Sequence, residues 1–430
     1  MIRIAPIGRA LAVATAASLA LTACGGGEET AAPASSAPAE TTTSAAAPAA
    51  GGDGVLTIGA LLPQTGDLAF LGPPEFAGVK LAVKEINEAG GVLGKPVVEI
   101  DTDSGDTKTD IASQSVDKLL AQNTDVIIGA ASSGVSKTVI DKITNAGVVQ
   151  FSPANTSPEF TTYPDKGLYF RTAPSDVLQG RVLGDLILQD GSDTVAILNR
   201  QDSYGNGLAD EVEKSVSGGG GQIVAKTPYD PAAADFSADV AKIKEANPKA
   251  LALISFNETT KIIPELKKQG IGPDKIKIYF VDGNLADYSK DFPKGTLEGV
   301  KGTLPGAKSP DDFRQKLLAV DPSLKDYSYA PESYDATILS ALAAEAAGSD
   351  AGTAVAGKLI DVSKGGEKCT DFAACLALLK AGKDIDYDGV SGPVEFSDAG
   401  DPSEATIGIY QYAADNTYAN VTYLSGKVAG

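Results

Sequence analysis

The sequence of 430 residues has no histidine and no tryptophan, and its one methionine is Met1. The absence of histidine excludes Ser-His-Asp and Cys-His nucleophile systems, and it excludes zinc sites that need a histidine ligand. Catalysis by carboxylates alone remains open, but no other feature of the sequence supports it. We therefore expect a protein that is not an enzyme and that holds no metal or other cofactor.

Cysteine is also scarce, and the first of the three, Cys24, ends the run Leu21-Thr22-Ala23-Cys24. Arg3 and Arg9 precede a short uncharged apolar stretch, which is typical of a secretory signal with a small-residue cleavage site. A transmembrane helix is disfavoured, because this alanine-rich run is too short to span about 20 residues of hydrocarbon. The run resembles a bacterial lipobox, which implies diacylglycerol on Cys24. We expect residues 1–23 to be a lipoprotein signal peptide and the mature chain to lie outside the cell, anchored to the membrane's outer face.

Basic residues are outnumbered, with 36 Lys and Arg against 56 Asp and Glu and a formal charge of −20. Loss of residues 1–23, which carry two arginines and no acid, makes the mature chain two units more negative still. Such a surface repels phosphate backbones and anionic lipid headgroups. Nucleic acid is therefore not an expected partner, and the membrane is expected to be reached only through the lipid.

The other two cysteines, Cys369 and Cys375, are six residues apart. In an oxidising compartment we expect them to form one local disulfide. Residues six apart on a helix point about 120° away from each other. Cys369 is therefore expected just before a helix, with Thr370 or Asp371 as N-cap. Two reduced, buried thiols are the alternative, and a two-cysteine metal site is disfavoured.

Residues 24–54 consist largely of Gly, Ala, Pro, Ser, Thr and Glu. This composition cannot bury a core, so it predicts a disordered tether. Roughly 375 residues remain after it, which suggests two lobes at about 100–200 residues each.

Strands and helices alternate after the tether. In the first series, we expect strands at 55–62, 96–102, 125–129 and 148–152, with helices that begin near 74, 109 and 135. In the second series, we expect strands at 194–199, 222–225, 250–255 and 276–281, with a helix at 235–246. Residues 311–383 are mainly helical in pattern, and extended stretches follow at 393–396, 406–412 and 418–424.

Repeated β-α units of this kind form doubly wound sheets. The predicted fold is α/β, with two similar doubly wound α/β lobes joined by a three-segment hinge. Lobe 1 is expected to comprise 55–171 and 303–391, and lobe 2 to comprise 172–302 and 392–430. The chain would then cross between lobes near Arg171, Thr303 and Ser391.

Ligands of open α/β sheets bind beyond the carboxyl ends of the strands. In lobe 1, Ser132 and Ser133 follow a strand and precede a helix, whose N-terminal amides suit a carboxylate. A simple helix cap is the alternative for these serines. Thr156 lies in the polar loop after the next strand, where an ordinary Pro/Ser turn is the alternative.

Lobe 2 supplies complementary groups after its own strands. Asp282 stands at a strand end beside glycine and suits an ammonium group, while Tyr204 and Phe256 can pack on an aliphatic or aromatic body. A carboxylate site in one lobe and an amine site in the other predict an amino acid that bridges both. Each of these residues alone could be an ordinary polar or aromatic loop residue.

Several motifs together resemble one family over about residues 55–424. They are 58–63 with Thr65-Gly66, the helix 77–87 with 90–94, Ser152-Pro153 with Thr156, 158–159 and Thr161, 171–174, Tyr204-Gly205 with Gly207-Leu208, and 235–237. The chain resembles the substrate-binding lipoproteins of the branched-chain amino acid class of ABC transporters, which have the type I periplasmic-binding fold.

The resemblance implies a binding protein that takes a branched-chain or other aliphatic amino acid between its lobes and delivers it to an ABC permease. Its ligand residues would fall on Ser133, Asn155, Thr156, Tyr204, Phe256 and Asp282, with the loop near Phe70 and Leu71 over the ligand. The chain lacks a tryptophan that some members use, and Phe256 stands where some have tyrosine, so side-chain selectivity stays open. Binding of an amide, urea or another small polar solute is an alternative, as is a sensory receptor lipoprotein. A purely structural lipoprotein would leave the polar clusters unexplained.

Overall fold

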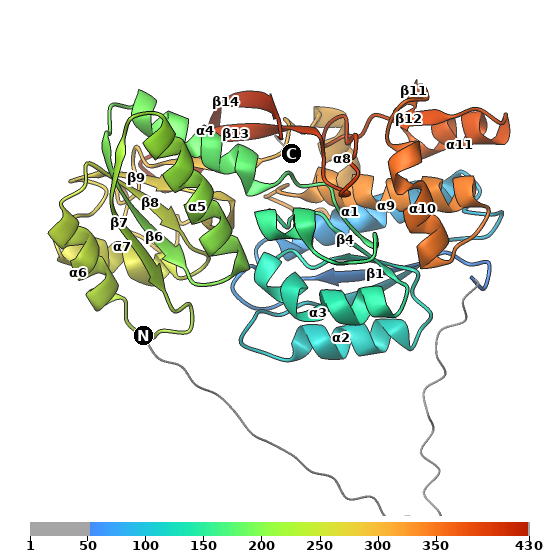
Figure 1. The fold of residues 1–430 in the computed structure, drawn as a ribbon, viewed down its shortest axis with the longest axis horizontal. Coiled ribbons are helices and arrows are strands. Elements are labelled where there is room, and N and C mark those ends of the chain that lie inside the picture. Colours follow the sequence, from blue (N-terminus) through green and yellow to red (C-terminus); the bar gives the residue numbers. More distant parts are fainter. Residues whose placement is uncertain (1–51, 429–430) are drawn as a thin grey trace, which may run out of the picture. The chain divides into compact units, whose positions relative to one another are not determined.

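The computed structural model describes residues 52–428 (Figure 1). The predicted signal peptide, the predicted lipidation site Cys24 and the predicted tether up to residue 51 lie outside the described residues. Within the described part, no helix combines the length and apolar character needed to cross a bilayer.

The first lobe is built on a five-stranded parallel sheet in the order β2-β1-β3-β4-β5. The strands are β1 (Thr57–Leu62), β2 (Val98–Asp103), β3 (Val126–Gly129), β4 (Val149–Ser152) and β5 (Tyr169–Arg171). Every residue of β1, β3 and β4 is buried. Continuous apolar strands of this kind belong in a parallel sheet that is covered on both faces.

Side chains of neighbouring residues in these strands point to opposite faces, and each face has its own helices. Ile58, Ala60 and Leu62 pack with one set, whereas Leu61 and Ile127 pack with the other. Figure 1 shows α1 and α9 on one side of this sheet and α2 and α3 on the other. The helices of this lobe are α1 (Gly72–Glu88), α2 (Ile111–Leu120), α3 (Ser133–Asn145), α8 (Asp311–Val320), α9 (Ala330–Ala347), α10 (Gly352–Val362) and α11 (Phe372–Lys380).

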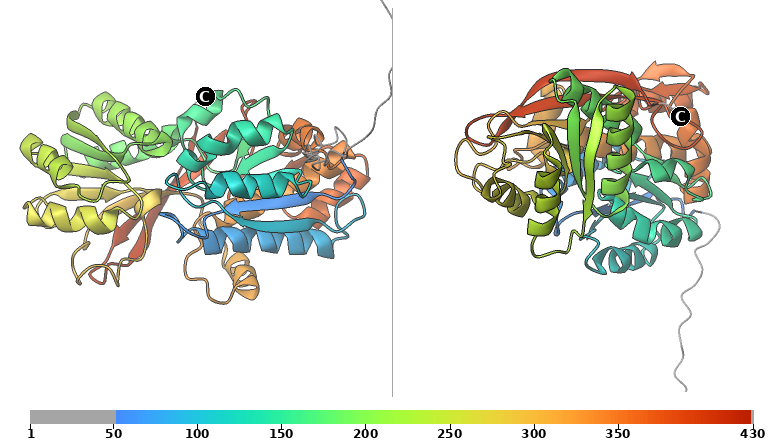
Figure 2. Two further views of the ribbon diagram at one scale, coloured as in Figure 1. Left: turned by 90° about the horizontal axis from the view of Figure 1, so that it is seen from below. Right: turned by 60° about the vertical axis from the view of Figure 1, so that its left-hand side comes forward.

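The second lobe is built on a seven-stranded mixed sheet in the order β14-β13-β10-β9-β8-β6-β7. Helices lie on both faces of this sheet (Figure 2). The strands are β6 (Thr194–Arg200), β7 (Gln222–Tyr229), β8 (Ala250–Ile254), β9 (Lys277–Phe280), β10 (Lys301–Pro305), β13 (Glu404–Tyr412) and β14 (Tyr418–Lys427). The helices are α4 (Asp176–Gln189), α5 (Ser203–Gly218), α6 (Ser237–Ala246) and α7 (Thr259–Lys268).

The two α/β lobes confirm the predicted fold class, and most element positions agree within a few residues. The predicted boundary between 302 and 303 falls inside β10, so the chain leaves the second sheet only after Pro305. Residues 393–396 were expected to be extended, yet they hold only a single bridge between Phe396 and Pro402. Proline has no N–H to donate to a ladder, which explains why this pairing does not continue.

The cysteine pair has the predicted local arrangement. Cys369 ends β11 (Glu367–Cys369) and is bonded to Cys375, which lies in α11, with 5.3 Å between their Cα atoms. Asp371 is the N-cap of α11 and accepts a hydrogen bond from the Ala374 N–H at 2.8 Å. β11 pairs with β12 (Ile385–Tyr387) in a small separate sheet.

Buried carboxylates fasten the segments that connect the lobes. Arg171, at the first crossing, is fully buried and pairs with Asp401 through contacts of 2.6 and 2.9 Å. At the third crossing, Asp335 accepts hydrogen bonds from Tyr387 Oη and from the N–H groups of Val390 and Ser391. These contacts fix where the hinge segments begin and end.

The Arg171–Asp401 pair yields a stability prediction. Asp401→Ala leaves a buried guanidinium without its counter-charge, so we expect the free energy of unfolding to fall by about 3–5 kcal/mol. The control is Asp193→Ala, which breaks the exposed ion pair with Lys249 and should cost less than about 1 kcal/mol. Urea unfolding measures both, and similar small losses for the two variants would contradict the assigned role of Arg171.

Candidate functional site

Asp282 lies at the junction of the lobes, where β9 ends in a short 3-10 turn (Asp282–Asn284). The carboxylate is buried and accepts three hydrogen bonds. Tyr204 Oη donates to Oδ1 at 2.6 Å, Gln179 Nε2 donates to Oδ1 at 3.1 Å, and Tyr329 Oη donates to Oδ2 at 2.8 Å. Tyr204 begins α5 and Gln179 lies in α4, whereas Tyr329 precedes α9 of the first lobe. One carboxylate therefore joins the two lobes.

Asp282 has neutral donors but no cationic partner within the part of the chain that the structure describes. Among the described residues, the buried arginines pair with other acids: Arg171 with Asp401, and Arg200 with Asp202 and Glu258. Burial raises the pKa of Asp282 above its usual range, although its three side-chain hydrogen bonds lower it. An added positive charge would stabilise the ionised carboxylate.

A second buried acid, Asp176, begins α4 close to this point. Its N–H donates to Thr156 O at 2.7 Å, which ties it to the polar loop of the first lobe. Both carboxylate oxygens of Asp176 and the hydroxyl of Thr156 are buried, and none of them has a partner of good hydrogen-bond geometry among the described residues. Burial raises the pKa of Asp176 well above its usual range, and the nearby charge of Asp282 raises it further. The Thr156 hydroxyl nevertheless lies close enough to Asp176 to lower the pKa of that carboxyl. Unpartnered buried polar atoms are costly, so this cluster favours an added donor or cation.

Aromatic side chains form one wall beside the acids. The rings of Tyr204 and Phe256 are stacked, with 5.2 Å between their centroids. Gly283 permits this packing, because a Cβ at that position would lie 2.5 Å from Phe256 Cδ1. The guanidinium carbon of Arg200 lies 3.6 Å from the centroid of the Phe256 ring, in a cation–π contact.

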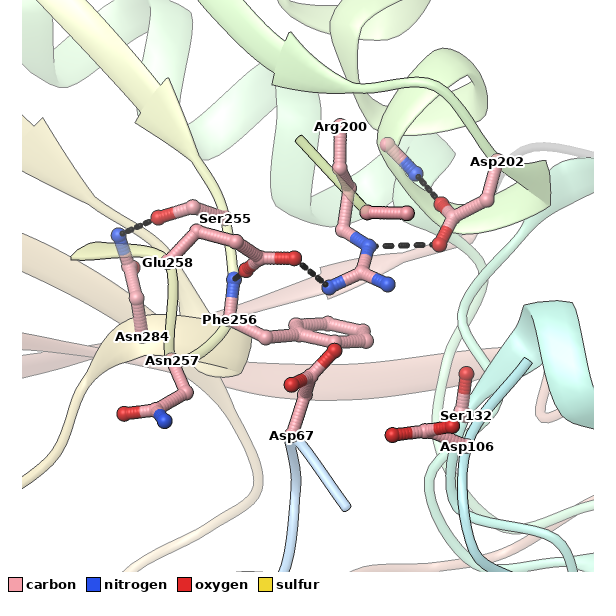
Figure 3. Close-up of polar contacts among 12 residues, drawn as sticks. Asp67, Asp106, Ser132, Arg200, Asp202, Ser255, Phe256, Asn257, Glu258 and Asn284 are labelled. Atoms are coloured by element: carbon pink, nitrogen blue, oxygen red, sulfur yellow. Dashed lines mark hydrogen bonds and ion pairs between the residues drawn. The ribbon is translucent and has the colours of Figure 1, made fainter. Parts of the chain in front are cut away.

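Figure 3 shows Arg200 between its two carboxylate partners and against Phe256. Its Nε lies 2.6 Å from Asp202 Oδ2, and its Nη1 lies 2.9 Å from Glu258 Oε1. First-lobe residues, among them Asp67, Asp106 and Ser132, lie on the other side of a small cavity of about 10 Å³. That volume holds about one water molecule. In this arrangement of the lobes, the cavity is too small to hold a ligand the size of an amino acid.

The predicted first-lobe residues differ in how their polar groups are used. Ser133 is buried at the start of α3, and its hydroxyl accepts a hydrogen bond from the Ser157 N–H at 3.4 Å. Asn155 is occupied within its own lobe, because its amide donates to the carbonyls of Ala130 and Ala131 and accepts from Tyr169 Oη. The amide of Asn155 thus holds the loop in place, and its contact with a ligand stays a prediction.

Phe70 and Leu71 precede α1 and reach the other lobe. Leu71 is buried within the same apolar cluster as Leu178 and Phe256 of lobe 2, and Phe70 packs against that cluster while partly exposed. A first-lobe loop therefore already contacts the second-lobe core.

The structure brings Tyr204, Phe256 and Asp282 together and links Thr156 to them through Asp176. Of the predicted residues, only Phe256 lines the small cavity of Figure 3. Convergence of Ser133, Thr156 and Asp282 on one cavity is not seen in this arrangement of the lobes and stays a prediction for a ligand-bound state.

Sequence reasoning missed four residues that contact or surround Asp282 and Phe256, namely Asp176, Gln179, Arg200 and Tyr329. Arg200 is the last residue of β6, and it lies one position beyond the predicted end of that strand at residue 199. Asp176 follows the predicted crossing by a few residues, where a helix cap is the ordinary expectation. Gln179 and Tyr329 give no local signal, because their partner Asp282 is far away in the sequence.

The sequence profile of the periplasmic binding protein family matches residues 55–417, and the chain belongs to this family. Among curated proteins, it is similar to the Leu/Ile/Val-binding protein homolog 1 of Brucella abortus. The two are 29% identical over 300 residues, which is 68% of this chain and 79% of that protein. The relatives are binding proteins rather than enzymes.

Solved structures share the fold. The branched-chain amino acid transporter substrate-binding protein LivJ of Streptococcus pneumoniae, in complex with isoleucine, has a TM-score of 0.70 and 22% identity, covering 87% of this chain and 99% of its own. A solute-binding protein of an ABC transporter from R. palustris, in complex with benzoate, has a TM-score of 0.67 and 19% identity, covering 88% and 98%. At these identities the likeness concerns the type I periplasmic-binding fold alone.

The raised pKa of Asp176 predicts a pH dependence of stability. The folded state holds a proton that the unfolded state releases above about pH 4, so stability is lost as pH rises from there towards the folded pKa. Asp176→Asn removes this contribution. Between pH 4.5 and pH 8, we expect the ligand-free variant to lose less stability than the wild type, by roughly 1 kcal/mol or more.

Urea unfolding at the two pH values measures this difference. The control is Asp185→Asn, an exposed position on the same helix, which should keep the wild-type pH dependence. An unchanged pH dependence in Asp176→Asn would show that this carboxyl titrates normally in the folded protein.

Proposed function

We propose that this protein binds one small amino acid, branched-chain or otherwise aliphatic, between its two lobes, with the ammonium group at Asp282. The observation that carries the proposal is a buried acidic cluster without a cation. Asp282 has only neutral donors, and Asp176 and Thr156 have unpartnered oxygens close by. A ligand ammonium supplies both the positive charge and the N–H donors that this cluster lacks.

The carboxylate end of the ligand is assigned to the first lobe. The first-turn N–H groups of a helix have no intrahelical acceptor, and the helix dipole adds positive potential there. α3 begins at Ser133, and the hydroxyl of Ser133 can turn towards an anion. Ser132 already caps α3 through the Val135 N–H, although at 3.4 Å that hydrogen bond is long.

The ligand's side chain would meet an apolar surface. Tyr204 and Phe256 supply stacked rings from lobe 2, and Phe70 and Leu71 approach from lobe 1. Burial of an aliphatic side chain of leucine size contributes about 1.5–3 kcal/mol, so this surface supports an aliphatic amino acid.

Binding is coupled to hinge motion. The ligand enters when the lobes separate, and closure is favoured as far as the ligand binds the closed form better. The Tyr329–Asp282 hydrogen bond spans the lobes and would have to break on opening. The proposal also includes attachment to the membrane through lipid on Cys24 and delivery of the ligand to an ABC permease. The LivJ structure, which is named as the substrate-binding protein of a branched-chain amino acid transporter, supports delivery.

An aromatic acid is the main rival ligand for the cleft, since the R. palustris protein binds benzoate. In this chain the cationic group closest to Phe256 is Arg200, which two carboxylates already neutralise. The ionised carboxylate of Asp282 would repel a ligand that carries only negative charge. The head group therefore favours a zwitterion.

A comparison of leucine with 4-methylpentanoate, its analogue without the amino group, tests the proposal by isothermal titration calorimetry. We expect Asp282→Asn to weaken leucine binding at least 30-fold, or about 2 kcal/mol, because the ammonium loses its charged partner. The affinity of the wild type for 4-methylpentanoate should be no higher than the affinity of Asp282→Asn for leucine. For 4-methylpentanoate itself, the substitution should not weaken binding.

Asp274→Asn, at an exposed position of the second lobe, is the matched control and should leave leucine binding unchanged. Valine, isoleucine, urea, short amides and benzoate complete the ligand set. Undiminished leucine affinity in Asp282→Asn would refute the ammonium site. Tighter binding of urea or an amide than of any amino acid would assign the cleft to a different solute.

A further inference from the structure

A second cavity, of about 370 Å³, lies where the hinge segments meet. First-lobe residues from α8 and from the loop before α9 form one side, and the strands β13 and β14 of lobe 2 form the other. Gly306, in the segment that follows β10, lies in its wall. The volume is within the range of small-molecule sites. Neither Phe256 nor Asp282 lines this cavity, so it is separate from the amino acid site proposed above.

We propose that this hinge cavity is a second binding site, which takes a small aromatic carboxylate and thereby changes the affinity of the cleft for its amino acid. The cavity is rich in tyrosine and carries two cationic side chains. The argument for the ligand class rests on those cations, on the ring geometry and on the state of the nearby acids.

The cationic groups are Arg314 and Lys325. Arg314 Nε is buried and has no hydrogen-bond partner, and the guanidinium carbon lies 5.2 Å from the centroid of the Tyr327 ring. Neither residue takes part in an ion pair within the described residues, whereas the buried arginines Arg171 and Arg200 both do. A buried guanidinium N–H without a partner suits a carboxylate, whose two oxygens match the planar donors of arginine.

The aromatic groups make a concave surface for a flat ring. Tyr410 lies edge-on to both Tyr418 and Tyr423, with centroid distances of 5.6 and 6.4 Å and interplanar angles of 85° and 82°. Tyr327 and Tyr329 line the cavity from the first lobe. Tilted and edge-on contacts are the geometry that aromatic rings prefer, so a benzoate-sized ring fits this surface.

Asp287, Asp326 and Glu332 are the acidic groups of the cavity. Asp287 accepts a hydrogen bond from the Ser289 N–H, and Asp326 accepts from both the N–H and the hydroxyl of Ser328. These neutral donors do not cancel the two negative charges, which offset the charges of Arg314 and Lys325. Burial raises the pKa of Glu332 to about 8, so that this carboxyl is mostly neutral at pH 7. The argument for a carboxylate ligand therefore rests on the unpartnered Nε–H of Arg314.

Tyr329 connects the cavity to the cleft. It lines the cavity, and its hydroxyl donates to Asp282 Oδ2 at 2.8 Å. A ligand that contacts both sides of the hinge also changes the relative stability of open and closed forms. Since coupling between two sites is reciprocal, the amino acid must change the affinity for the aromatic acid by the same factor. Only this coupling rests on the function proposed for the cleft.

Calorimetric titration of the purified protein with benzoate, in the absence and presence of saturating leucine, tests the proposal. We expect benzoate to bind in both cases, with affinities that differ at least threefold. Arg314→Gln should weaken benzoate binding at least tenfold and leave leucine binding to the benzoate-free protein unchanged. Asp282→Asn should weaken leucine binding and leave benzoate binding unchanged. Benzamide, which has the same shape without the charge, should bind at least tenfold more weakly than benzoate.

Lys325→Gln, at an exposed position, should give a smaller loss of benzoate affinity. This second variant keeps the test decisive if Arg314→Gln fails to fold. Competition between benzoate and leucine for one site would assign benzoate to the cleft and overturn the proposal. Benzoate affinity that survives both Arg314→Gln and Lys325→Gln would overturn it as well, as would an absence of benzoate binding. Failure of Asp282→Asn to affect leucine would contradict only the function proposed for the cleft.

Discussion

The junction of the two lobes depends on a buried carboxylate, Asp282, that forms no ion pair with any of residues 52–428. Asp282 keeps its place through donors from three separate segments, Gln179, Tyr204 and Tyr329. Burial of a charge without a counter-ion is costly. Burial accordingly raises the pKa of Asp282, and a cation arriving from outside would stabilise the ionised form. In the function proposed above, this cluster is the site of the ligand's ammonium group.

The rest of the fold positions this cluster. Parallel strands place the polar loops of each lobe at the carboxyl ends of their sheets, as open α/β sheets do. The crossings are fastened to the lobes by buried acids, with Arg171–Asp401 at the first and Asp335 at the third. The hinge motion proposed for ligand binding would therefore be confined to short segments between the two sheets. The tyrosine-lined cavity lies where these segments meet, so ligands at the two proposed sites would act on the same motion.

Much of the fold could be predicted from the sequence. Buried runs such as 126–129 and the helical spacing after Pro74 are local patterns, and the six-residue spacing of Cys369 and Cys375 allowed a local disulfide. Residues at strand ends could likewise be found, because Phe256 and Asp282 directly follow predicted strands and Tyr204 lies in the loop region after another. Contacts between distant segments could not. Tyr329 bonds Asp282 across 47 residues of sequence, and Arg200 is enclosed by acids that only the folded chain brings together. The end of β10 at Pro305 was also missed, because its partner β13 lies about 100 residues later.

The most direct test of the central claim is a crystal structure of the protein with leucine bound. The account predicts that the leucine nitrogen lies within hydrogen-bond distance of Asp282, with Asp176 or Thr156 also in contact, and that the leucine carboxylate lies at the start of α3. Leucine bound with its carboxylate towards Asp282, or bound away from the junction of the lobes, would contradict it.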